Sequence, residues 1–297
     1  MAMTADEILV HPVLEPCVRG QAQALLSIQG SAPRISSVFA TQQRWLMGHA
    51  ALALYFRGEA EEAGGGLMTE RFLEIVAQHD IASRNTASSF LKEMLKYDIV
   101  RIAPNCVSQR VRTLAPSPAA LSALCGWHVV HLATLDRLDG GARVVTFNAD
   151  PAMLGTIQPR IADALIGSKE VREPGGTFSL FTWVNEGGIV MDRLIFGCQP
   201  GASGGRIPTD ITSVSALAQR LKLSRTQLGR KLAEAEAMGS LGWSGTRGKS
   251  ALWVSEDFRR QYLSAQAVKL AIIDAAFAAC ATRGAHSDAS APQRAFA

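Results

Sequence analysis

Residues 217–241, LAQRLKLSRTQLGRKLAEAEAMGSL, carry the clearest fold signal of this chain, and a weaker copy, VAQHDIASRNTASSFLKEMLKYDIV, stands at residues 76–100. Two pairs of residues return unchanged 141 positions later. They are Ala77 and Gln78, which return as Ala218 and Gln219, and Ser83 and Arg84, which return as Ser224 and Arg225. A repeat of this kind predicts that one structural unit occurs twice.

Short matches at similar spacing continue along the chain. They pair HPVL (11–14) with DPAM (150–153), AQALL (22–26) with ADALI (162–166), SVF (37–39) with SLF (179–181), and HLATLD (131–136) with KLAIID (269–274). Their shared order predicts two homologous halves, residues 1–140 and 141–282, related by a pseudo-twofold axis like a covalent homodimer. Residues 283–297 contain few large apolar side chains and are predicted to be a disordered tail.

Each copy of the repeat predicts a helix, a tight turn and a second helix. In the second half, Ser224 followed by Gln227 is a capping-box signal for a helix start, and Leu228, Lys231, Leu232 and Ala235 follow at inward positions. In the first half, Ser83 starts a helix in which Ala87, Phe90, Leu91 and Met94 share one apolar face. The expected arrangement is a helix-turn-helix.

A hairpin is predicted after each second helix. The strand, tip and strand segments are IVRIA, PNCVSQ and RVRTL in the first half, and LGW, SGTRGK and SALWV in the second. A hairpin in this position is a wing. Further helices are predicted at 13–29, 35–57, 117–138 and 257–281, with a glycine-rich loop at 58–66. The expected fold class is mostly α, with two winged helix-turn-helix units, each with flanking dimerisation-type helices.

These motifs resemble the MarR family of winged helix-turn-helix regulators. The resemblance rests on residues 217–241 with the wing WSGTRGKSALWV, and on residues 75–100 with RVRTLAPSPAAL. It implies a transcriptional regulator that binds double-stranded DNA. Members of the family normally carry one unit per chain and dimerise, so two units imply a built-in pseudo-dimer, and whether a further homodimer forms is open.

The predicted reading surface is basic. Residues 217–250 contain seven basic and two acidic residues. Their local charge is therefore +5, in a chain with a net charge of +4. Arginine on a helix in the major groove can bind guanine, and cations beside it bind phosphate. The residues predicted to contact DNA are Arg84, Asn85, Ser88, Ser89, Lys92 and Arg110 in the first half, and Lys222, Arg225, Thr226, Arg230, Arg247 and Lys249 in the second. Acidic residues near this surface predict that the first half binds DNA more weakly than the second.

A pocket for a small aromatic effector is predicted where the helical core meets the DNA-binding lobes. Its expected lining residues are Trp45, Trp127 and Trp183, although aromatic residues at helical spacing are more often ordinary core. The spacing of Cys125, His128 and His131 carries the three side chains round their helix, so no metal site is predicted. Cys17 is expected to be an inert thiol rather than a peroxide sensor.

Other classes of protein fit the sequence less well. Nucleophile elbows, paired acids and nucleotide fingerprints do not occur, so neither an enzyme nor a cofactor is expected. Five unpaired-looking cysteines and the absence of an export signal indicate a cytoplasmic protein without a membrane partner. The predicted function is a sequence-specific regulator that acts as a repressor. The alternatives are a tandem winged-helix protein-interaction module and a replication initiator.

Overall fold

The computed structural model describes residues 2–31, 39–60, 66–103, 113–182, 187–202 and 204–288, with side chains described as far as Ala281. These residues form fourteen helices and two three-stranded antiparallel sheets. The mostly helical class predicted from the sequence is confirmed. Arg110, Trp183 and most of the predicted tail lie outside the described residues.

The helices of the first half that flank its sheet lie close to their predicted positions. They are α1 (Ala5–Leu9), α2 (Leu14–Ser31), α4 (Gln42–Ala60) and α7 (Pro118–Asp139). The predictions at 13–29 and 117–138 are confirmed to within two residues. The prediction at 35–57 is wrong at both ends, because residues 39–41 are not helical and the helix runs on through Arg57 to Ala60, into the predicted loop. Glu59 and Ala60 are good helix formers, which explains the extension.

The second half has more helices, most of them short, and ends with the longest described helix, α15. They are α8 (Arg143–Ala149), α9 (Met153–Gly167), α10 (Lys169–Arg172), α11 (Gly176–Thr182), α12 (Gly187–Gly197) and α15 (Glu256–Asp288). Glycines stand at the first positions of α11 and α12, where they weaken a continuous helix. The closing helix predicted at 257–281 is confirmed as part of α15, but the helix continues to Asp288, so the prediction of disorder is wrong for residues 283–288.

Each half also contains one βααββ unit. The first unit consists of β1 (Leu67–Met68), α5 (Thr69–Gln78), α6 (Arg84–Lys96), β2 (Val100–Ile102) and β3 (Thr113–Pro116). The second consists of β4 (Arg206–Pro208), α13 (Val214–Leu221), α14 (Arg225–Ala237), β5 (Leu241–Trp243) and β6 (Leu252–Ser255). The strand order is β1-β3-β2 in one sheet and β4-β6-β5 in the other, so the last strand is central in both. The sequence did not predict the edge strands β1 and β4.

The two units repeat the same backbone turns. Asp80 and Lys222 both have a left-handed backbone, with φ of 50° and 57°, within two residues of the end of the first helix of their unit. Asp98 and Gly239, with φ of 56° and 72°, do the same after the second helix. Left-handed residues at matching helix ends let the chain reverse direction and satisfy free carbonyl groups. The units therefore share their turn geometry as well as their topology.

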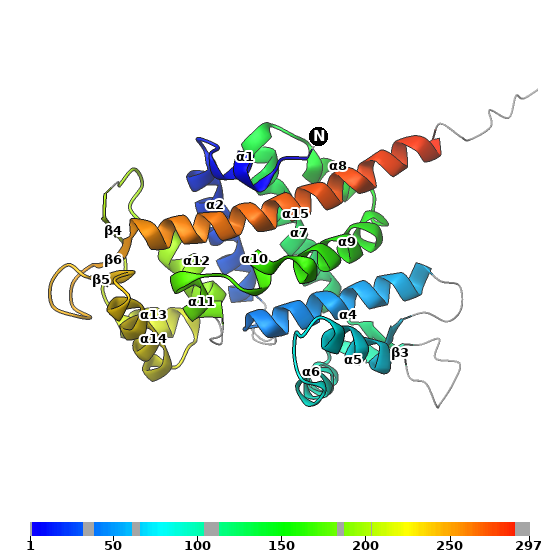
Figure 1. Ribbon diagram of the computed structural model, residues 1–297, viewed down its shortest axis with the longest axis horizontal. Coiled ribbons are helices and arrows are strands. Elements are labelled where there is room, and N and C mark those ends of the chain that lie inside the picture. Colours follow the sequence, from blue (N-terminus) through cyan, green and yellow to red (C-terminus); the bar gives the residue numbers. More distant parts are fainter. Residues whose placement is uncertain are drawn as a thin grey trace, which may run out of the picture.

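Helices of the two halves pack against each other in reciprocal pairs (Figure 1). The helix α4 packs on α9, and α2 packs on α12; likewise α1 packs on α15, and α8 packs on α7. Small residues on α4, among them Ala50, Ala51 and Ala53, are buried and allow a close helix approach. In each pair one helix comes from residues 1–140 and the other from beyond them, so each half completes the core of the other.

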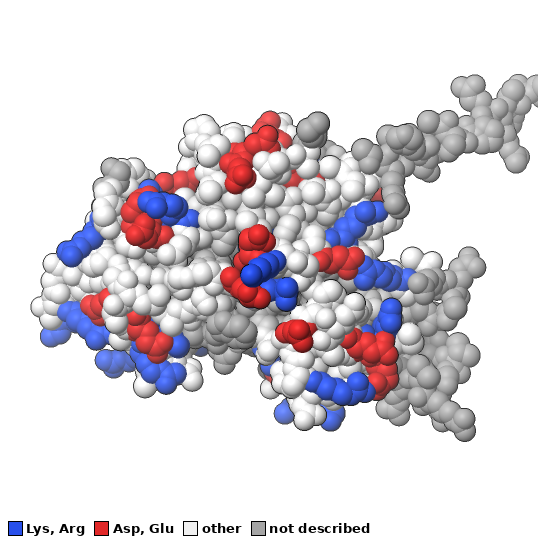
Figure 2. All heavy atoms as spheres, viewed as in Figure 1, with Lys and Arg blue, Asp and Glu red and all other residues white. Residues whose placement is uncertain are grey.

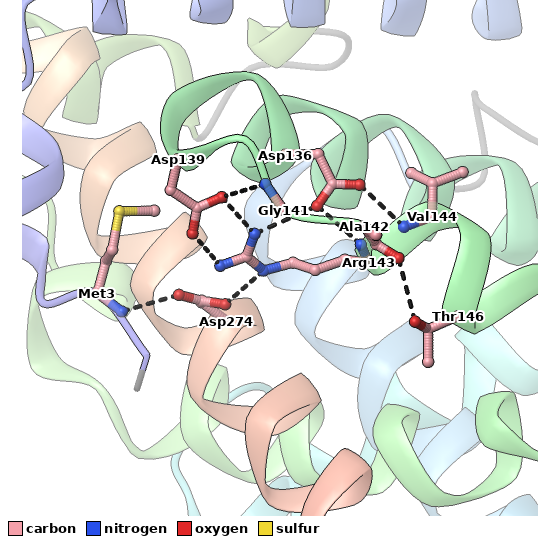
Figure 3. Close-up of polar contacts among 9 residues, drawn as sticks. All are labelled: Met3, Asp136, Asp139, Gly141, Ala142, Arg143, Val144, Thr146 and Asp274. Atoms are coloured by element: carbon pink, nitrogen blue, oxygen red, sulfur yellow. Dashed lines mark hydrogen bonds and ion pairs between the residues drawn. The ribbon is translucent and has the colours of Figure 1, made fainter.

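A buried ionic junction ties the halves together where the end of α7 meets the middle of α15 (Figure 3). Arg143 Nε donates to Asp274 Oδ1 at 2.7 Å, and its terminal nitrogens donate to Asp136 and Asp139. Asp136 also accepts from the backbone N–H groups of Arg143 and Val144, while Asp274 accepts from that of Met3. A carboxylate on α7 thus accepts backbone N–H groups at the start of α8, and a carboxylate on α15 accepts one just before α1. In both cases the last helix of one half binds the start of the first helix of the other half. These carboxylates raise the pKa of Arg143 above its ordinary value.

Two helices of the described chain, α7 and α15, are long and apolar enough to cross a bilayer by length and composition alone. Their most apolar windows have mean hydropathies of 1.2 and 1.5. Both helices pack against other helices here, and both bury polar side chains, His128 and His131 in α7 and Asp274 in α15. Core helices of this kind have the same length and composition as membrane spans.

Candidate functional site

The helix α14 separates an apolar face from a polar one. Leu228, Leu232 and Ala235 are buried, as the sequence predicts. Ser224 caps the helix, and its Oγ accepts from the Gln227 N–H at 3.4 Å. The return bond of the predicted capping box, from the Gln227 side chain to the Ser224 backbone, does not form between these two residues. The opposite face of α14 is left to solvent.

Basic residues occupy that exposed face. Arg225 and Arg230 on α14, Lys222 in the preceding turn, and Arg247 and Lys249 in the hairpin are all exposed. Arg230 lies 3.8 Å from Glu234, and Arg247 lies 3.3 Å from Glu236, in pairs that exposure to water makes weak. Lys222, Arg225 and Lys249 make no ion pair with a described residue. Thr226, also predicted to contact DNA, is exposed beside them.

The hairpin that follows α14 has an ordered tip. Its strands are joined by a Ser244 N–H donating to the Ala251 carbonyl at 2.9 Å. Inside the tip, the Gly245 N–H donates to Ser250 Oγ at 2.9 Å, and that hydroxyl donates to the Thr246 carbonyl at 3.0 Å. The tip therefore holds Arg247 and Lys249 on defined backbone next to α14.

The first unit presents a more balanced face. Arg84, Asn85, Ser89 and Lys92 on α6 are exposed, whereas Ser88 is half-buried. The guanidinium of Arg84 lies 2.6 Å from the Glu70 carboxylate on α5, so its charge is already matched. By sequence, residues 67–116 of this unit hold seven basic and five acidic side chains, whereas residues 206–255 hold eight basic and three acidic ones.

Both units lie on one edge of the molecule. In Figure 1 the helices α13 and α14 lie at the lower left and α5 and α6 at the lower right, below the helices that join the halves. Figure 2 shows Lys and Arg gathered along the lower left edge, over the second unit, with fewer over the first. An extended polyanion laid along this edge can contact both units.

A large cavity of about 970 Å³ lies between the halves. Its described lining residues come mainly from α2, α4 and α7 of the first half and from α10, α11, α12 and α15 of the second. The first βααββ unit adds Leu67, Met94, Ile99, Val100 and Pro116. Trp45 and Trp127, two of the three predicted pocket residues, line it together. The rest of its wall is mostly apolar and aromatic, with Tyr55 and Phe178 among its members.

One corner of this cavity is charged. Lys269 on α15 and Asp192 on α12 both line it, and Tyr262 donates a hydrogen bond to Asp192 Oδ1 at 2.5 Å. Burial raises the pKa of Asp192 to about 6, although the Tyr262 bond and the Lys269 charge oppose the rise. Burial lowers the pKa of Lys269 to about 8, opposed by Asp192. Lys269 makes no hydrogen bond or ion pair with a described residue.

Three buried histidines stand beside this corner. The Trp127 and His131 rings pack at a tilt of 38° with their centres 4.1 Å apart, and His49 packs edge-on between Trp45 and Trp127. His128 and His131 donate through Nδ1 to backbone carbonyls of their own helix, which leaves each Nε2 buried without a partner among the described residues. Burial lowers the pKa of all three rings, to about 3 for His49 and about 4 for His128.

Lys269 and Asp192 are not predicted from the sequence, although both leave a signal in it. Asp192 interrupts the apolar run IVMDRLIF, and Lys269 interrupts AVKLAIID. A charged residue inside an otherwise apolar helix is rarely buried without a reason. The repeat also pairs Lys269 with His131, so the two halves place different ionisable groups at matching positions.

Other candidate sites remain without support. The described residues contain no group of three His, Cys, Asp or Glu side chains placed to hold a metal ion. Burial raises the pKa of the Cys17 and Cys125 thiols, and that of Cys198 to about 11, which keeps the three protonated and unreactive.

Comparison with known proteins adds no relative: no family model, curated protein or solved structure matches the chain.

Proposed function

We propose that the chain is a double-stranded DNA-binding transcriptional regulator, in which the two βααββ units are winged helix-turn-helix modules of a MarR-like pseudo-dimer. The observation that carries the proposal is the exposed basic face of α14 and its hairpin, on a helix whose apolar face is fully buried. A helix presented in this way fits the major groove, and the hairpin beside it lies over the backbone or minor groove.

The location of both units on one edge supports a two-headed mode of binding. The two βααββ units differ in charge, so the two half-sites of the operator are expected to differ as well. The second unit supplies most of the electrostatic attraction to DNA. Repression is the favoured mode, because covering a promoter requires no additional activating surface. An effector site in the cavity at Trp45 and Trp127 would couple ligand binding to the distance between the two βααββ units.

The test is a gel-shift titration against the DNA beside the coding region, repeated over a range of salt concentrations. We expect the affinity for DNA to fall steeply as the salt concentration rises. The double variant Arg225→Ala/Arg230→Ala is expected to flatten the slope by about 2, because each arginine neutralises about one phosphate. The matched control is Arg137→Ala, an exposed arginine on α7 outside both units. A wild-type log-log slope near zero refutes the proposal.

A second candidate function has one observation in its favour. The first unit exposes large apolar side chains near the end of α6 and the adjoining strands, namely Met68, Leu95, Tyr97 and Ile102, each at least 40% exposed. Large exposed apolar side chains are more typical of a protein contact than of a DNA contact. If Leu95→Ser/Ile102→Ser leaves DNA binding intact but abolishes a regulatory effect in cells, the first unit binds a protein partner.

A further inference from the structure

The cavity between the halves has the size and composition of a ligand site. Its volume of about 970 Å³ lies at the upper end of the range of about 300–1,000 Å³ found for pockets that enclose drug-sized molecules. Because both halves contribute helices to one continuous space, a molecule that fills it contacts residues 1–140 and residues beyond 140 at the same time. One ligand per chain is therefore expected, where a symmetric dimer would offer two equivalent sites.

The charged corner defines the polar group of such a ligand. Asp192 and Lys269 supply one carboxylate and one ammonium group to the same wall, without a direct ion pair between them. A hydroxyl group can satisfy both, because it donates to a carboxylate and accepts from an ammonium at the same time. Tyr262 already makes such a donation to Asp192 from the protein side.

The charges of the wall disfavour a charged ligand. Its acidic members are Glu170, Glu173, Asp192 and Asp257, against the basic Arg260 and Lys269. Arg260 is already paired with Asp257 at 3.3 Å. The charged side chains of the wall other than Asp192 and Lys269 are exposed to water, which screens them. Away from water a bound carboxylate would face Asp192, while a cation would face Lys269. An uncharged ligand avoids both costs, since an unmatched buried charge is strongly unfavourable.

We propose that this cavity binds one uncharged, largely apolar molecule per chain, held at its polar end by a hydroxyl group between Asp192 and Lys269 and along its body by Trp45 and Trp127. Binding itself does not depend on the proposed DNA function, but its role as an effector rests on it. A ligand that spans both halves favours one arrangement of the two units, and its effect on DNA affinity is matched by an equal effect of DNA on ligand affinity.

The test uses four pyrene probes that differ only at the end of the side chain. They are 1-pyrenebutanol, 1-pyrenebutanoic acid, 1-pyrenebutyl-trimethylammonium and 1-butylpyrene. Energy transfer from tryptophan to pyrene reports binding, because Trp45 and Trp127 line the site. We expect saturation at one pyrenebutanol per chain, with an affinity about tenfold higher than that of butylpyrene, the effect of one to two buried hydrogen bonds, and higher than that of either charged probe.

Two variants assign this preference to the corner. Asp192→Asn and Lys269→Met are each expected to reduce the advantage of the alcohol over butylpyrene to less than about threefold. Lys169→Met, an exposed lysine on α10, is the matched control and should leave the advantage unchanged. Thermal unfolding confirms that each variant is folded; if one is not, the other still provides the test.

Several outcomes overturn the proposal: tightest binding of the acid or the cation, two probes per chain, an advantage that survives both substitutions, or no saturable binding of any probe. A gel-shift with and without pyrenebutanol separates this proposal from the DNA function. If the probe binds and no DNA does, the regulator function fails and the cavity assignment stands; if DNA binds and no probe does, the reverse holds.

Discussion

The side chain of Arg143 lies 2.7 Å from Asp274, and both are almost fully withdrawn from water, with exposed fractions of 10% and 2%. The two residues belong to different helices, α8 and α15, and Asp274 also holds the backbone of Met3. Three parts of the chain that are far apart in sequence therefore meet at one carboxylate.

Removal of the arginine should destabilise the protein severely. We expect Arg143→Met to lower the free energy of unfolding by about 3–5 kcal/mol, because it leaves three carboxylates facing one another with their partner gone. Urea unfolding measures the loss. Arg57→Met is the control, since its exposed pair with Asp163 contributes at most about 1 kcal/mol. Equal losses in the two variants would show that the junction contributes little to stability.

Acid should unfold the protein through its buried histidines. Their pKa values are lowered in the folded state, to about 3 for His49 and about 4 for His128, from 6.5 in the unfolded chain. Below pH 6.5 the unfolded chain therefore binds more protons, and stability that is present at neutral pH falls by up to about 1.4 kcal/mol per pH unit for each ring. Asp192 opposes this loss, because its raised pKa of about 6 favours the folded state as the pH falls toward 3.8.

The variant His128→Phe isolates one ring of the three. Phenylalanine keeps the stacking on Phe147 and has no titrating group. Between pH values of about 7.5 and about 5, we expect it to lose about 2 kcal/mol less than the wild type in urea unfolding. An unchanged pH dependence in His128→Phe would mean that this ring is protonated in the folded protein.

Release of Arg84 should strengthen DNA binding. Glu70→Gln removes the carboxylate that holds this guanidinium and lowers the negative charge of the first unit. We expect DNA affinity to rise up to about fivefold, with a salt dependence steeper by up to about 1. Glu74→Gln is the control on the same helix, where the carboxylate pairs with Arg71 instead. If the two variants have the same effect, the gain is a matter of net charge and Arg84 does not contact DNA.

The start of α14 depends on a single cap. Ser224→Ala should lower the free energy of unfolding by about 1 kcal/mol, because the Gln227 N–H loses its acceptor. Gln227→Ala should be nearly neutral, since its side chain makes no return bond to Ser224. Chemical unfolding of both variants tests this; a comparable loss in Gln227→Ala would restore the full capping box.

Local elements could be predicted from the sequence, whereas the pairing of helices could not. The inward face of α14 and the cap at Ser224 follow from residue spacing within a few turns of helix. The packing of α4 on α9 depends on surfaces separated by about a hundred residues, and a pattern of apolar positions does not say which other helix covers it. For the same reason the sequence located Trp45 and Trp127 near a pocket but not the corner at Asp192 and Lys269, which only the folded chain brings together.

The reciprocal packing of the halves also sets the order in which the chain can complete its fold. When translation has reached Gly140, the faces of α2 and α4 that later meet α12 and α9 are still open, and their partners have not been synthesised. These apolar surfaces stay exposed to other chains until α9 and α12 have left the ribosome. Two identical fragments that end there could instead cover each other, as separate subunits do.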